Sequence, residues 1–151
     1  MGISALDPPL QAISDVVLRD GSTMRFRPPE RGDASALLEF FRSLSDRSVY
    51  LRFHGHPAID ERLVEPVLEP DWLERDALLG MEGDRIASLA NYVRLRNAGT
   101  AEVAFAVADD LQGRGIATRM LERLAALANL VGSQPPSFAR SRRRLSTRSR
   151  Y

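Results

Sequence analysis

The chain has 151 residues, 44% of them hydrophobic and 27% charged, with a net charge of +1 and no cysteine. This composition fits one globular domain with its own core, and the lack of cysteine excludes disulfides, thiolate catalysis and thiolate metal sites. No apolar run could cross a membrane, and no basic segment followed by an apolar one marks a secretory signal. We therefore expect no membrane partner and a cytoplasmic location.

Charge is distributed unevenly along the chain. Residues 138–151 hold six arginines and no acid, so subtracting these six charges from +1 leaves residues 1–137 at −5. All 21 basic residues are arginine, and the chain therefore offers no lysine of its own for modification.

The first elements predicted are a β-hairpin and a helix. Two β-prone runs, 16–19 and 23–27, flank Asp20-Gly21-Ser22, and Asp-Gly between such runs is a strong hairpin signal. Apolar residues at helical spacing then predict a helix over 34–44, with Asp33 as its N-cap.

Two further helices are expected before the next strands. One covers 45–53 and ends at Gly55, where a glycine can take the left-handed conformation of a helix end, and the other covers 59–68. His54 and His56 flank Gly55 with no further ligand at metal spacing. We therefore expect surface histidines and no metal site.

Three strands follow without a helix between them. They are predicted over 77–81, 86–95 and 102–108, with turns at Gly83-Asp84 and at 97–100. Consecutive strands without helical crossovers form an antiparallel meander, and the fold class is therefore α+β rather than the alternation of a Rossmann domain.

The last strand leads through a glycine-bearing turn into an amphipathic helix. The turn reads Gln112-Gly113-Arg114-Gly115, and the helix has an apolar face at Ile116, Met120, Leu124 and Leu127. Glycines remove side chains where a phosphate must approach backbone amides, and the start of a helix favours negative charge. Two glycines in a turn are a weak signal alone, since a simple helix-capping turn would look alike.

The turn also carries a family signature. Gln112, Gly115 and Ala117 fit [Gln/Arg]-x-x-Gly-x-[Gly/Ala], and over roughly residues 15–130 the chain resembles the GNAT superfamily of N-acetyltransferases. Several segments resemble the subgroup with bacterial protein lysine acetyltransferases, in which the domain is often fused to an acyl-CoA synthetase-like or a cyclic-nucleotide-binding region. They are VLRDGST (17–23), RFRP (25–28), YLRF (50–53) and YVRL (92–95).

The resemblance implies a GNAT fold, a largely antiparallel mixed sheet flanked by helices, and acetyl-CoA as cosubstrate. The pyrophosphate would dock on the turn and helix start, and the pantetheine arm would pair with the backbone of Phe105, Ala106 and Val107. The docking residues implied are Gln112, Gly113, Arg114, Gly115, Ile116, Ala117 and Thr118. For Arg114 the alternative is a solvated side chain.

Glu102 is the catalytic residue that the resemblance implies. An amine must be neutral to attack a thioester, and neutralising a lysine of pKa about 10.4 at pH 7.4 costs about 4 kcal/mol. A nearby general base removes that proton, and in the lysine acetyltransferase subgroup a glutamate on this strand is the base. Strand alternation puts Glu102 on a shallow face with Ala104, Ala106 and Ala108. The alternative is a glutamate at the exposed start of a strand.

The pattern of a complete domain stops after Ala128. We expect a flexible segment over 1–14, an incomplete GNAT domain over 15–130 and a disordered, arginine-rich tail over 131–151. A shifted reading frame, a fragment of a longer protein and a genuine divergent element are the three explanations.

Three functions follow for the chain. The first is transfer of an acetyl group to an amine, with a protein lysine as the acceptor that the subgroup implies. The second is a truncated, inactive relative that at most binds CoA weakly. The third is nucleic-acid binding by the arginine tail, against which the acidic remainder of the chain argues. The sequence leaves the oligomeric state open.

Overall fold

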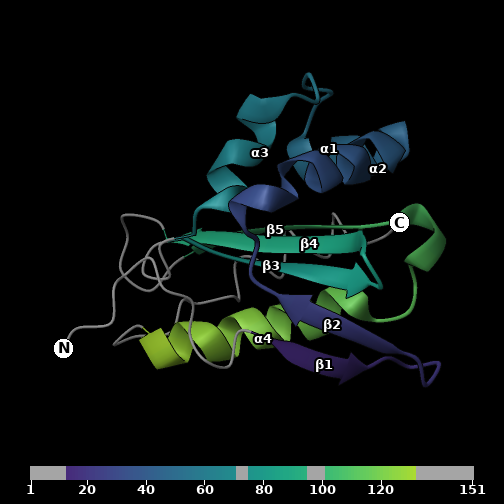
Figure 1. Cartoon of the computed structure of the whole chain (residues 1–151), viewed down its shortest axis with the longest axis vertical. Helices are drawn as coiled ribbons and strands as arrows, with labels where there is room; N and C mark the ends of the chain where they lie inside the picture. Colours follow the sequence, from purple (N-terminus) through teal and green to yellow (C-terminus); the bar gives the residue numbers. More distant parts are fainter. Residues whose placement is uncertain (1–12, 71–74, 95–100, 132–151) are drawn as a thin grey trace.

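The computed structural model describes residues 13–70, 75–94 and 101–131. Five strands and four helices follow one another in the order β1–β2–α1–α2–α3–β3–β4–β5–α4, as the sequence predicts (Figure 1). Their bounds are β1 Ser14–Val17, β2 Thr23–Arg27, α1 Ala34–Ser43, α2 Asp46–Phe53, α3 Glu61–Leu68, β3 Arg75–Glu82, β4 Arg85–Arg94, β5 Ala101–Val107 and α4 Ile116–Val131. The 3₁₀ turns η2 (Arg31–Asp33) and η3 (Asp109–Leu111) precede α1 and α4.

The five strands form one sheet in sequence order, β1-β2-β3-β4-β5, and each neighbouring pair is antiparallel. The predicted meander is therefore confirmed. A parallel pair, which would make the sheet mixed, is not found within 13–70, 75–94 and 101–131. The expected turn at 97–100, the arginine-rich tail and residues 1–12 lie outside the described residues.

Helices cover both faces of the sheet. α1, α2 and α3 lie on one side and α4 lies on the other (Figure 1). The predicted apolar face of α4 is buried, with Ile116, Met120, Leu124 and Leu127 each at most 2% exposed. Because both faces are covered, the middle strands bury consecutive rather than alternate residues, as in the stretch from Asp76 to Gly80.

The hairpin turn is longer than the sequence predicts, which changes the position of Arg19. β1 ends at Val17 rather than at residue 19. The Leu18 N–H donates to the Ser22 carbonyl at 2.8 Å, and the Gly21 N–H donates to the Leu18 carbonyl at 3.0 Å. Arg19 therefore lies in the turn and not in a strand.

Two helix ends also differ from the predictions. Asp33 precedes α1, but its side chain does not cap that helix. Its carboxylate accepts from the Arg27 guanidinium at 2.7 and 2.8 Å and from the Glu30 N–H at 2.7 Å. These bonds, that from Arg27 foremost, lower the pKa of Asp33. α2 ends at Phe53, and the left-handed residue that follows it is His54, with φ of 56°, rather than Gly55.

None of the described helices combines the length and the apolar character needed to cross a bilayer.

Candidate functional site

β5 lies at one edge of the sheet formed by the described strands. Among the described strands its only neighbour is β4. The Ala108 N–H, just after β5, donates to the Ala87 carbonyl at 2.8 Å and so points towards β4. Successive residues of a strand point their main-chain groups to opposite sides, and the N–H and C=O groups of Phe105 and Val107 therefore face away from β4. An extended ligand can pair with such an edge.

A turn with two left-handed glycines connects β5 to α4. Gly113 has φ of 83° and Gly115 has φ of 81°, a backbone conformation that other residues adopt only at a cost. The Arg119 N–H donates to the Gly115 carbonyl at 3.1 Å, which closes the first turn of α4. The N–H groups of the residues before Arg119 have no partner within the helix and attract anions.

A cavity of about 260 Å³ lies where the edge of β5, the glycine turn and α2 meet. Nine of the ten residues predicted to hold the cofactor line it: Phe105, Ala106, Val107, Gln112, Gly113, Gly115, Ile116, Ala117 and Thr118. Four further residues, which the sequence does not predict for this site, also line it: Arg19, Ser48, Leu51 and Leu111. Leu51 lies in the YLRF segment that supported the family resemblance.

The Gln112 side chain makes two hydrogen bonds at the cavity. Its Nε2 donates to the Val107 carbonyl at 3.1 Å and to the Ser48 hydroxyl at 3.2 Å. Ser48 is in turn tied to Ser45, the N-cap of α2, through a bond between the two hydroxyls at 3.1 Å. The first residue of the glycine motif therefore connects the end of β5 to the start of α2.

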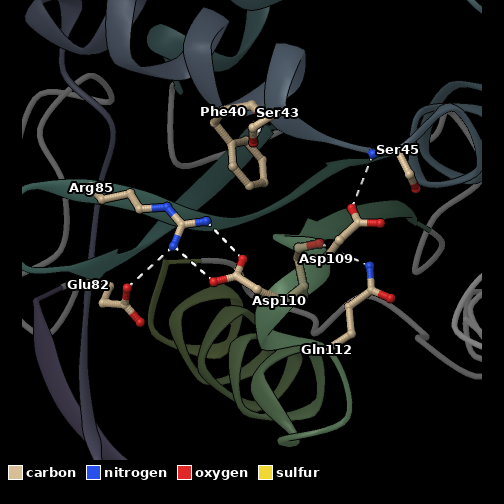
Figure 2. Close-up of polar contacts among 9 residues, drawn as sticks. Phe40, Ser43, Ser45, Glu82, Arg85, Asp109, Asp110 and Gln112 are labelled. Carbon is tan, nitrogen blue, oxygen red and sulfur yellow. Dashed lines mark hydrogen bonds and ion pairs between the residues drawn. The ribbon is translucent and has the colours of Figure 1, made fainter.

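Two aspartates in η3 anchor the same turn to distant parts of the chain (Figure 2). The Ser45 N–H donates to Asp109 Oδ1 at 3.2 Å. Arg85, at the start of β4, donates to Asp110 Oδ1 at 2.9 Å and to Oδ2 at 3.2 Å. The guanidinium holds the pKa of Asp110 below its usual range. These contacts hold the glycine turn on the sheet.

Arg114 is the one predicted cofactor residue that the structure places outside the cavity lining. Its Nη1 lies 3.1 Å from Asp20 Oδ2 in the hairpin turn, and both side chains are more than 40% exposed. The side chain is thus directed to Asp20, because the hairpin turn packs against the glycine turn.

Glu102 is exposed and does not line the cavity. It lies opposite Val93 of β4, and Ala104 lies opposite Asn91, whose Oδ1 accepts from Arg52 of α2. Cross-strand partners share a face, and Glu102 is therefore on the face covered by α1, α2 and α3. Glu102 stands three residues, or about 10 Å, along the strand from Phe105 in the cavity.

Tyr92 of β4 belongs to the core and not to the cavity, since it is 1% exposed. Burial, and then the carboxylate of Asp76 opposite it in β3, raise the pKa of the Tyr92 phenol far above its usual value. Within 13–70, 75–94 and 101–131, no group of three His, Asp or Glu side chains could hold a metal ion.

Comparison with known proteins identifies the family. The model of the acetyltransferase (GNAT) family matches residues 37–134, a stretch that contains β5, the glycine turn and α4. The chain belongs to this family. Acetyltransferase Pat of Mycolicibacterium smegmatis is 34% identical over 122 residues, which make up 79% of the chain and 37% of Pat. The chain thus spans little more than a third of this curated relative.

Solved structures agree with this assignment. The GNAT domain of S. lividans PAT superposes with a TM-score of 0.77 at 36% identity, over 83% of this chain and 77% of that domain. A cAMP-binding acyltransferase from Mycobacterium smegmatis gives a TM-score of 0.54 at 28% identity, over 90% of this chain and 42% of that protein. The ribosomal L7/L12 acetyltransferase RimL, solved with coenzyme A, shares the fold at 13% identity, with a TM-score of 0.55 over 70% of this chain and 63% of RimL.

Proposed function

We propose that this GNAT domain transfers an acetyl group from acetyl-CoA to an amine, and that the amine is a protein lysine. The observation that carries the proposal is the cavity, because it joins an anion-attracting helix start to an open strand edge. Acetyl-CoA has a pyrophosphate for the first and an amide-bearing pantetheine arm for the second. The lysine acceptor rests on the resemblance to the protein lysine acetyltransferase subgroup.

Different groups of the site would bind different parts of acetyl-CoA. The N–H groups at the start of α4, beside Gly113 and Gly115, would donate to the pyrophosphate. The outward N–H and C=O of Phe105 and the outward N–H of Val107 would pair with the amides of the pantetheine arm, whereas the Val107 carbonyl already accepts from Gln112. An arm that runs along β5 away from the glycine turn leads towards Glu102.

Glu102 would act as the general base. The amine nitrogen forms a bond to the acetyl carbon, the carbon–sulfur bond breaks, and coenzyme A leaves. The proton lost by the amine passes to the Glu102 carboxylate, either directly or through one water. An exposed carboxylate on the α2 side of the sheet suits a bulky protein acceptor, because the acceptor need not enter the cavity.

Calorimetric titration of acetyl-CoA tests the cofactor site. Gly115→Glu would place a carboxylate on the phosphate-binding turn and strain its left-handed backbone, and we expect it to abolish detectable binding. Gly83→Glu is the matched control, since Gly83 is also left-handed, with φ of 60°, and is exposed with open space around it. Equal affinity of wild type and Gly115→Glu for acetyl-CoA would refute the site.

An acetyl-transfer assay on lysine-containing peptides separates the active enzyme from the inactive relative considered above. Turnover with a cooperative thermal melt would support the enzyme. Binding of acetyl-CoA without transfer to any amine would support the inactive relative.

A further inference from the structure

We propose that Arg19, in the turn of the β1–β2 hairpin, supplies the cationic contact to the pyrophosphate of coenzyme A. The family signature covers only the glycine turn and assigns nothing to this hairpin. The inference rests on the proposed function, and it adds a residue that decides how tightly the site holds phosphate.

Arg19 reaches the glycine turn from across the chain. Its side chain lines the cavity together with Gly113, Gly115 and Thr118. Its Nε lies 3.1 Å, and its Cζ 3.6 Å, from the position that a Cβ on Gly115 would occupy. Because Gly115 has no side chain, the guanidinium can lie directly over the backbone that leads into α4.

The charges around the cavity leave Arg19 available for an anion. None of the described residues that line the cavity is acidic. The nearest carboxylate in sequence, Asp20, accepts from the Ser22 N–H at 2.9 Å and pairs with Arg114 at 3.1 Å. Arg19 has no ion pair with any residue in the described part of the chain.

The two neighbouring arginines therefore have different roles. Asp20 holds Arg114 outside the cavity, and this pair fastens the hairpin turn to the glycine turn. Arg19 is the cation that faces the cavity, beside the positive end of the α4 dipole. A guanidinium can donate two parallel hydrogen bonds to a phosphate, a geometry that the N–H groups of the turn complement.

The test is calorimetric titration of the full chain with three ligands: coenzyme A, 3′-dephospho-CoA and pantetheine. Arg19→Gln should weaken binding of the first two about tenfold, which is about 1.4 kcal/mol, and leave pantetheine unchanged. Arg19→Lys should recover most of the loss, because it restores the charge. Arg25→Gln is the control, since Arg25 is an exposed arginine of the same hairpin, paired with Asp15.

The outcomes separate the two proposals. If wild type binds no coenzyme A, the proposed function fails and Arg19 fails with it. If wild type binds coenzyme A and Arg19→Gln binds it equally well, only the role of Arg19 is refuted. An equal loss for pantetheine would mean that Arg19 shapes the cavity rather than contacts phosphate. A loss confined to coenzyme A would move the contact to the 3′-phosphate and overturn the assignment.

Discussion

The two ends of β5 are built differently. At the Val107 end, the Gln112 side chain donates to the Val107 carbonyl. Just beyond β5, Asp109 accepts from the Ser45 N–H and Asp110 pairs with Arg85 of β4. At the other end Glu102 is exposed, and its cross-strand neighbour Val93 is 40% exposed. A preformed site loses little freedom when it binds a ligand of fixed shape, whereas an open surface admits acceptors of different shapes. The difference suits an enzyme with one donor and a protein acceptor.

The largest effect is expected at the Glu102 end of β5. Glu102→Gln keeps the size of the side chain and removes its basicity, and kcat for lysine acetylation should fall by about 10²- to 10⁴-fold. Affinity for acetyl-CoA should stay unchanged, because Glu102 does not line the cavity. Steady-state kinetics and calorimetry measure the two quantities.

Glu65→Gln provides the control for this experiment, since Glu65 is an exposed glutamate of α3. Turnover of Glu102→Gln within about threefold of wild type would show that Glu102 is an exposed residue without a catalytic role.

A smaller effect is expected from removing a hydrogen bond at the Val107 end of β5. Gln112→Ala removes the bonds to the Val107 carbonyl and the Ser48 hydroxyl. We expect a loss of about 1–2 kcal/mol in the free energy of unfolding and about tenfold in affinity for acetyl-CoA. Thermal melting and calorimetry measure both.

Ser48→Ala isolates one of these two bonds and should have the smaller effect. If Gln112→Ala matched wild type in both measurements, neither the stability of the Val107 end of β5 nor the binding of acetyl-CoA would depend on this side chain.

The smallest effect is expected for the ion pair between Asp110 and Arg85, whose contribution to stability depends on pH. Because the Arg85 guanidinium lowers the pKa of Asp110 in the folded chain, this pair stabilises the fold above the unfolded pKa of about 3.9. The contribution is lost as the pH falls through the lower, folded value. Wild type should therefore melt slightly above Asp110→Asn at pH 7, and the gap should narrow as the pH falls below about 3.9.

Asp84→Asn, in the neighbouring turn, controls for the loss of one negative charge. A gap between wild type and Asp110→Asn that is the same at pH 7 and pH 3 would contradict the assignment.

Local patterns in the sequence predicted much of the glycine turn and of α4. The helical spacing of Ile116, Met120, Leu124 and Leu127 identified the buried face of α4, because that period depends on the helix alone. The two glycines likewise indicated a turn before this helix, and the turn is found there, with both glycines in the left-handed conformation. The order of the elements and the antiparallel meander were predicted in the same way.

Contacts between distant segments could not be predicted. The sequence placed Arg19 in a strand, because the β-prone run continues through it and nothing local shows that pairing stops at Val17. Ser48 and Gln112 are 64 residues apart, and no periodicity connects them. Arg114 looked like a phosphate ligand by its place in the motif, but a carboxylate 94 residues away sets its direction.

The pairing of Asp20 with Arg114 has a consequence for the order of folding. It joins the first hairpin to the turn before the last described helix, across 94 residues of chain. Contacts of such separation form late, since the intervening chain must first be ordered. We therefore expect the strands of the meander to gain protection from hydrogen exchange before the glycine turn does. A ligand bound at that turn would then slow exchange in β1 as well, the strand at the far edge of the sheet.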